Sequence, residues 1–128
     1  RAVFSQWPGA IILSGFEIGA AIKTGLPLIN NKNIQGSPVK EVFSICIPMS
    51  TQDKDGRMSW DETAVLVAIR GWEKYYTLQP GRFIINEDGS NAWDNAGKGH
   101  FYLIQKMPPP AMTALINQLI MHQPATRE

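Results

Sequence analysis

The sequence predicts a single α/β domain, and three observations support this fold class. A short apolar run, AIILSG at residues 10–15, is typical of a strand buried on both faces, as in a parallel sheet. Several segments repeat apolar residues at helical spacing. From Tyr76 onward, β-rich pieces alternate with turn residues, which predicts a small antiparallel hairpin or meander. The length of 128 residues agrees with one domain.

The N-terminal part of the chain predicts a helix end, a strand and a short helix. RAVFSQW, residues 1–7, has the pattern of the last turns of a helix whose beginning is absent. The strand at 10–15 follows it. FEIGAAIKTG, residues 16–25, then predicts a short helix that Gly25 closes.

The middle of the chain predicts two longer helices separated by a polar loop at 50–58. PVKEVFSICI, residues 38–47, begins with Pro38, which fits a first helical turn because the N–H there has no intrahelical partner. The second helix begins at Ser59. Its apolar residues recur at three- and four-residue intervals, as on one face of a helix: Ala64, Val65, Val67, Ala68 and Trp72.

The C-terminal part predicts about three strands, around 75–78, 82–86 and 100–105, and a closing helix. PPPAMTALINQLIMHQ, residues 108–123, places five apolar side chains on one helix face: Met112, Leu115, Ile116, Leu119 and Ile120. Only one of the predicted strands has the pattern of a buried strand in a parallel sheet, and such a strand needs neighbouring strands beside it. We therefore expect the chain to be part of a larger α/β domain.

Composition excludes several classes of function. With 44% hydrophobic and 18% charged residues, the chain should bury a core. Its formal net charge is +1 and its basic residues are scattered, so we expect neither a nucleic-acid partner nor an anionic membrane surface. No run of 18 apolar residues is present to span a membrane. The lone Cys46 lies in an apolar run and is expected to be structural. These features do not indicate a compartment.

The stretch SWDETAVLVAIRG, residues 59–71, admits two interpretations. Ser59 and Glu62 have the spacing of a capping box, and acidic residues are favoured in the first turn of a helix. Alternatively, Asp61 points into a ligand site and Trp60 forms its wall, since ligand sites are often built beside polar loops. The capping interpretation leaves Trp60 unexplained.

Other candidates have simpler explanations. The loop NEDGSNAWDNAG, residues 86–97, suggests calcium but lacks EF-hand spacing, and its Asp-Gly and Asn-Ala-Gly pieces are typical of hairpin turns. His100 and His122 have no second histidine or cysteine at metal-ligand spacing, so we expect structural or surface roles.

Five stretches resemble the C-terminal part of nucleoside hydrolases of the inosine-uridine-preferring type, most closely a bacterial subgroup. They cover nearly the whole chain: RAVFSQWP, ILSGFEIGAAIKTG, SWDETAVLVAIRG, YYTLQPGRFIINEDGSNAW and HFYLIQKMPP. The resemblance implies an open, mostly parallel α/β sheet with flanking helices. It also implies that residues 1–128 are the C-terminal portion of one hydrolase domain whose N-terminal metal-binding half is absent.

The resemblance implies hydrolysis of the bond between ribose and a nucleobase, with one Ca²⁺ as cofactor and a nucleoside as substrate. Asp61 matches the calcium-ligand aspartate that opens a helix late in the family sequence. Trp60, just before it, matches the tryptophan with which purine-preferring members stack on the base. Glu17 is typical of the subgroup, and we expect a structural role for it, as for Tyr75 and Tyr76, which match no transferable motif.

The chain also departs from the family pattern. The family's N-terminal cluster D-x-D-x-x-x-D-D and its ribose-binding Asn/Glu segment do not occur in it. We therefore expect no catalytic residue within the chain and no activity from the chain alone. Two alternatives stay open. One is a non-catalytic module that binds nucleosides or sugars, and the other is a structural subunit, such as a homo-oligomer, that completes its site with another chain.

Overall fold

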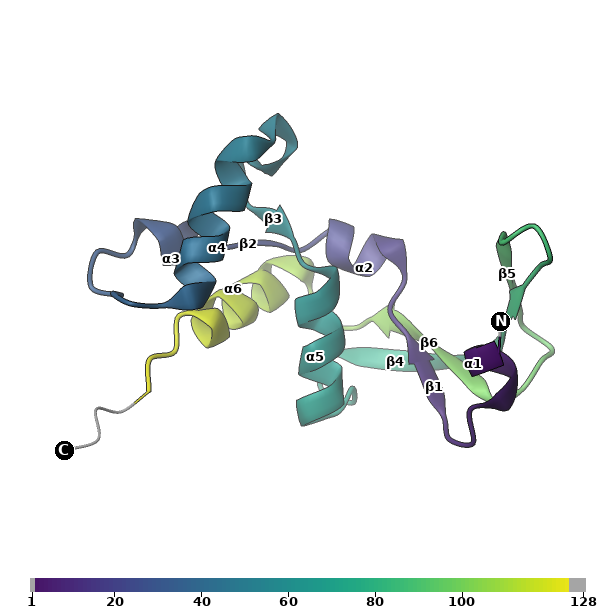
Figure 1. Cartoon of the computed structure of the whole chain (residues 1–128). Helices are drawn as coiled ribbons and strands as arrows, with labels where there is room; N and C mark the ends of the chain where they lie inside the picture. The colour runs from purple at the N-terminus through teal and green to yellow at the C-terminus, as the bar shows by residue number, and fades with distance from the viewer. Residues whose placement is uncertain (1, 125–128) are drawn as a thin grey trace.

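The computed structural model describes residues 2–124 of the chain. Figure 1 shows an elongated arrangement, with helices α3 (Leu26–Asn30) and α4 (Pro38–Cys46) at one end and the main sheet at the other. Between them lie α2 (Phe16–Ala20), α5 (Trp60–Arg70) and α6 (Pro109–Ile120). The described residues thus form an α/β structure, as the sequence predicts.

The main sheet is open and mixed, with the strand order β1-β6-β4-β5. Strand β1 (Ile11–Leu13) runs parallel to β6 (His100–Gln105). Strand β4 (Tyr76–Ile85) is antiparallel to β6 and to β5 (Asn91–Asp94). The antiparallel meander expected from the turn residues is therefore confirmed, whereas the mostly parallel sheet that the resemblance implies is not seen within residues 2–124.

A second sheet and several short helices complete the chain. Strands β2 (Lys23–Thr24) and β3 (Arg57–Met58) pair antiparallel. Helix α1 (Ala2–Gln6) places Phe4 against Phe83 of β4, with ring centroids 5.0 Å apart. Two 3₁₀ turns, Ile47–Met49 and Thr51–Asp53, follow α4. No helix among the described residues is long and apolar enough to cross a membrane.

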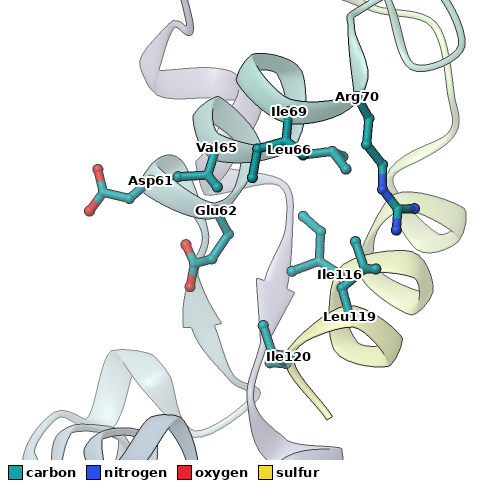
Figure 2. A pocket seen from close by; sticks show the side chains of 9 residues that line it. All are labelled: Asp61, Glu62, Val65, Leu66, Ile69, Arg70, Ile116, Leu119 and Ile120. Atoms are coloured by element: carbon teal, nitrogen blue, oxygen red, sulfur yellow. The ribbon is translucent and has the colours of Figure 1, made fainter. Parts of the chain in front are cut away.

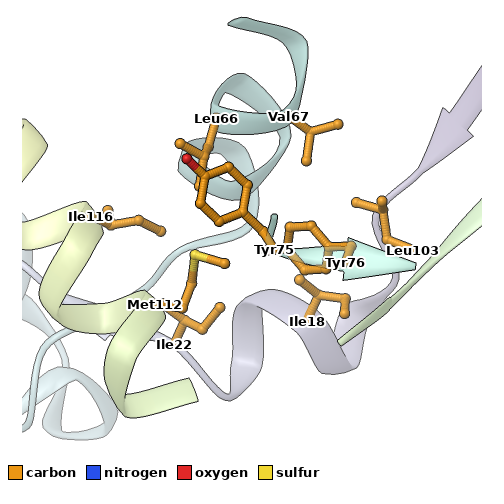
Figure 3. Packing of buried hydrophobic residues seen from close by; sticks show 9 residues of the cluster. All are labelled: Ile18, Ile22, Leu66, Val67, Tyr75, Tyr76, Leu103, Met112 and Ile116. Atoms are coloured by element: carbon orange, nitrogen blue, oxygen red, sulfur yellow. The ribbon is translucent and has the colours of Figure 1, made fainter. Parts of the chain in front are cut away.

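The larger core cluster joins α2, α5 and α6 to the sheet (Figure 3). Leu103 of β6 is 1% exposed, and Met112 and Ile116 supply the buried face of α6 that the sequence predicts. Tyr75 and Tyr76 lie in this core, as expected. The hydroxyl of Tyr76 has no hydrogen-bond partner in the described structure, and burial raises the pKa of Tyr76 to about 12.

The smaller core cluster packs α3 against α4 through four buried side chains: Leu28, Ile34, Phe43 and Ile47. Gly25 lies beside it with φ of 98°, and a Cβ there would lie 2.3 Å from the Phe43 ring. This glycine was expected to close the helix at 16–25. Instead, α2 ends at Ala20 and β2 follows, so Gly25 lies just before the start of α3. Glycine fits this position for two reasons: its backbone is left-handed, and the Phe43 ring leaves no room for a side chain.

Three sequence-based expectations need correction. The strand at 10–15 was expected to be buried on both faces, yet β1 pairs only with β6 among the described residues and Ile12 is 39% exposed. The expected strands at 75–78 and 82–86 form the single strand β4, because Gln79 and Pro80 continue the pairing with β6 without a turn. The polar loop at 50–58 contains a 3₁₀ turn and β3.

Replacing Leu103 by alanine tests the main core. We expect Leu103→Ala to lower the free energy of unfolding by about 2–5 kcal/mol, because the cavity forms where α5, α6 and the sheet meet. Ile104→Ala is the matched control on the same strand; its side chain is 44% exposed, so the loss should stay below about 1 kcal/mol. Urea unfolding measures both, and equal losses would contradict the assigned core.

Candidate functional site

Ser59 anchors the start of α5, although not as a capping residue. Its side chain is fully buried and makes no capping hydrogen bond. Its hydroxyl lies 2.7 Å from that of Thr24, which is also buried, and its N–H donates to the carbonyls of Gly19 and Ile22. The expected capping box is therefore wrong: two buried hydroxyl groups satisfy each other because neither can reach water.

Trp60, the first residue of α5, is held against α2 (Phe16–Ala20). The indole Nε1–H donates to the carbonyl oxygen of Phe16 at 2.8 Å, and the two rings lie 5.3 Å apart between centroids, inclined by 37°. A Cβ on Gly19 would lie 2.3 Å from Cδ1 of Trp60, so the indole covers the bare backbone of that glycine. The orientation of Trp60 therefore depends on α2 from two sides.

The spacing of the two rings limits how Trp60 can bind a base. A planar base needs about 3.5 Å on each of its faces, so two rings that sandwich it stand about 7 Å apart. The Phe16 and Trp60 rings are closer than that and are tilted. Stacking on Trp60 is therefore confined to the ring surface that Phe16 leaves free, unless the highly exposed Phe16 side chain moves aside.

Asp61 follows in the first turn of α5 and is exposed. Figure 2 shows its carboxylate pointing away from the apolar side chains around it. Among residues 2–124 it has no hydrogen-bond or ion-pair partner. Glu62, the next residue, is half-buried; its burial, and secondarily the negative charge of Asp61, raise the pKa of Glu62. Asp61 thus presents a free carboxylate at the positive end of the helix.

Asp61 belongs to no cluster of acidic or other metal-binding side chains in the described part of the chain. Ca²⁺ takes about six to eight oxygen ligands. No group of three or more His, Cys, Asp or Glu side chains in the described part of the chain is arranged to hold a metal ion. Asp61 could supply one ligand to such an ion.

A cavity of about 410 Å³ opens between α5 and α6, beside this helix start (Figure 2). It has a largely apolar lining with charged groups at its ends: Asp61, Glu62, Val65, Leu66, Ile69, Arg70, Ile116, Leu119 and Ile120. The sequence analysis missed it, because the cavity depends on how two helices distant in sequence pack together.

Glu17 has a structural partner on the neighbouring strand. The hydroxyl of Tyr102 on β6 donates to Oε1 of Glu17, and the Tyr102 ring packs on Trp93 with centroids 5.6 Å apart. Burial, followed by the adjacent carboxylate, raises the pKa of Tyr102 to about 12. The Tyr102 hydroxyl and the Glu17 carboxylate both lie against Gly15, where a Cβ would collide with the Tyr102 hydroxyl. Glu17 therefore ties α2 to the sheet, in agreement with the expected structural role.

The remaining candidates have structural roles or lie apart from the helix start. Nδ1 of the buried His100 accepts the N–H of Phe83 at 2.9 Å, whereas His122 is exposed after α6. In the loop at 86–97, Asp88 accepts hydrogen bonds from the backbone and hydroxyl of Ser90, which lower the pKa of Asp88. These are turn contacts, as expected. Cys46 packs against the smaller core cluster.

Comparisons of this chain with protein families, with curated proteins and with solved structures find no match. Trp60 and Asp61 are the first two residues of α5, and the Trp60 indole is hydrogen-bonded to α2. His100 and Asp88 lie in other parts of the structure, where they make hydrogen bonds to Phe83 and Ser90.

A double-mutant cycle tests the anchor of this helix start. Ser59→Ala and Thr24→Val should each cost about 1–3 kcal/mol of unfolding free energy, because each removes the hydrogen bond between two buried hydroxyl groups. The double variant should cost less than the sum of the two, with a coupling of about 1 kcal/mol. Additive losses in urea unfolding would instead indicate that Ser59 acts independently of Thr24, as a capping residue would.

Gly19→Ala tests the packing of the Trp60 ring on Gly19. Alanine normally stabilises a helix by about 1 kcal/mol relative to glycine. Here we expect a loss of about 1–3 kcal/mol, since the added methyl group overlaps the indole ring. Gly9→Ala is the control, because a Cβ there meets only ordinary contacts with Trp7. Stabilisation by Gly19→Ala in thermal or urea unfolding would show that Trp60 does not rest on Gly19.

Proposed function

We propose that this chain is the C-terminal part of a calcium-dependent nucleoside hydrolase that favours purine ribonucleosides. The observation that carries the proposal is the start of α5, where an anchored indole and an unpartnered carboxylate lie on consecutive residues. The five stretches that resemble the family support it, because the same two residues fall on the family's base-stacking and metal-ligand positions.

Each of the two residues has a role that its environment favours. Trp60 is partly exposed, and the part of its ring that Phe16 leaves uncovered could stack on a purine. Stacking of a base on an aromatic ring contributes about 1–3 kcal/mol in other proteins. The carboxylate of Asp61 is exposed and unpaired, so binding a cation there would break no existing contact in the described structure. In the family, Ca²⁺ holds ribose hydroxyls and water, and its remaining ligands would come from the absent N-terminal half.

A nucleoside- or sugar-binding module without hydrolytic activity is the second candidate. It is favoured by the partly exposed ring of Trp60, which could stack on a base without any metal ion. The two candidates differ in whether the longer polypeptide releases ribose or only binds the nucleoside.

Replacing Asp61 tests the metal role. The protein to test is the longer polypeptide that contains both this chain and the proposed N-terminal aspartate cluster. In it, Asp61→Asn should lower calcium-dependent ribose release from inosine by about 100-fold or more. Even residues that only hydrogen-bond to a metal ligand change metal affinity or activity by about 10–100-fold when they are replaced. It should also lower the rise in melting temperature that calcium produces. Asp55→Asn, an exposed carboxylate in the preceding loop, is the control and should change neither.

Two results would count against the proposal. Full turnover by Asp61→Asn would remove Asp61 from the metal site. Nucleoside binding with no ribose release, whether or not calcium is present, would favour the binding module. The chain of residues 1–128 alone should release no ribose under any of these conditions.

A further inference from the structure

The loop between α4 and α5 buries one charged side chain. Asp53 ends the 3₁₀ turn Thr51–Asp53 and is 1% exposed, whereas its neighbours Gln52 and Lys54 are exposed. Its Oδ2 accepts a hydrogen bond from the guanidinium of Arg57 at 2.6 Å, so the two residues form an ion pair. The other oxygen, Oδ1, is buried and has no hydrogen-bond partner in the described structure. Arg57 therefore supplies the charge that lets this carboxylate be buried.

The ion pair closes a turn that the backbone closes as well. The N–H of Gly56 donates to the carbonyl oxygen of Asp53 at 2.8 Å. Gly56 has φ of 110°, and a Cβ there would lie 2.8 Å from the carbonyl oxygen of Thr24 on β2. Arg57 pairs with the same Thr24 across the small sheet. The turn at 53–57 is thus fixed at both of its ends and rests on β2.

Arg57 also contacts the start of α5. The hydroxyl of Ser59 donates to the carbonyl oxygen of Arg57 at 3.4 Å, and Trp60 and Asp61 follow Ser59 directly. The positive charge of Arg57 attracts Glu62 in the first turn of α5, where it opposes the rise that burial causes in the pKa of Glu62. The turn at 53–57 is therefore linked to α5 through the chain, through a hydrogen bond and through charge.

An ion pair is suited to fixing the geometry of this turn. Taking two charges out of water costs free energy that their attraction only partly returns, so a well-packed apolar pair often stabilises a protein at least as well. A charge-assisted hydrogen bond differs from apolar packing because it fixes the distance and direction between its two groups. Among the described residues, the main core cluster includes none from this turn, so losing the ion pair should leave that core packed.

We propose that the Asp53–Arg57 ion pair positions the start of α5, and with it both residues of the proposed site. The pair closes the turn, the turn fixes β3, and α5 begins directly after β3. When the pair is broken, the helix start should open locally while the main core stays folded. What Trp60 and Asp61 bind rests on the function proposed above, whereas their positioning by the ion pair does not.

Native-state hydrogen exchange of the whole chain distinguishes positioning from general stability. In the parent chain, the Ser59 and Leu103 amides should open with equal free energies. Asp53→Asn keeps the shape of the side chain but removes its charge, so the Ser59 amide should then open about tenfold more often than the Leu103 amide. A pair that only stabilised the fold would affect both amides equally. Asp55→Asn, at an exposed position of the same turn, is the matched control and should keep the two amides equal.

Variants of Arg57 test the pair from its other end. Arg57→Gln leaves the buried carboxylate without its cation and should open the Ser59 amide more than Asp53→Asn does, because Arg57 is 47% exposed and can turn to water when it loses its partner. Arg57→Lys keeps a cation and should retain most of the protection of Ser59. Circular dichroism confirms folding, and Asp53→Asn and Arg57→Lys decide the result if Arg57→Gln does not fold.

Equal opening of the Ser59 and Leu103 amides in folded Asp53→Asn would overturn the proposal, as would an Arg57→Lys chain that opens like Arg57→Gln. In the longer polypeptide, Asp53→Asn should raise the calcium concentration for half-maximal ribose release by about tenfold or more, because the ligand is misplaced. Leu103→Ala should not change that concentration. Local opening of Ser59 in a polypeptide that never releases ribose would reject the proposed function and keep the positioning role.

Discussion

The buried junction at Ser59 is the interaction on which the rest of this structure depends. Its N–H donates to two carbonyls at the end of α2, those of Gly19 and Ile22, at 3.2 and 3.0 Å. Its hydroxyl pairs with that of Thr24 in the small sheet. One residue thus connects the consecutive elements α2 and β2 with the start of α5, which lies much further along the chain. Since all of these groups are buried, opening the junction would leave several polar atoms without partners.

The exposed features at the start of α5 follow from that junction. With Ser59 fixed beneath α2, Trp60 lies across Gly19 and reaches the carbonyl of Phe16, and the next residue, Asp61, turns to solvent. An indole bound on two sides loses little freedom when a ligand stacks on it, which favours binding. A rigid helix start also holds a carboxylate more precisely than a loop would.

Patterns along the chain predicted what depends on local periodicity. The buried face of α6 with Met112 and Ile116, the antiparallel meander and the pair Trp60-Asp61 at a helix start were all accessible in this way. The role of Ser59 was not, because the letters of a capping box are the same whether the serine is exposed or buried against Thr24. Gly25 was assigned to the wrong helix, since only the packing of Phe43 shows which neighbour needs it. The cavity between α5 and α6 depends on a tertiary contact that no local pattern records.

Hydrogen exchange of the Ser59 amide tests the central claim most directly. An amide that is shared between two buried carbonyls and flanked by a buried hydroxyl pair should exchange only when the whole chain unfolds. We therefore expect the opening free energy of Ser59 to equal that of the core amides around Leu103, as measured by NMR under native conditions. Exchange of Ser59 through low-energy local opening, as at a fraying helix terminus, would contradict the account. The start of α5 would then be a mobile end and not the fixed platform described for Trp60 and Asp61.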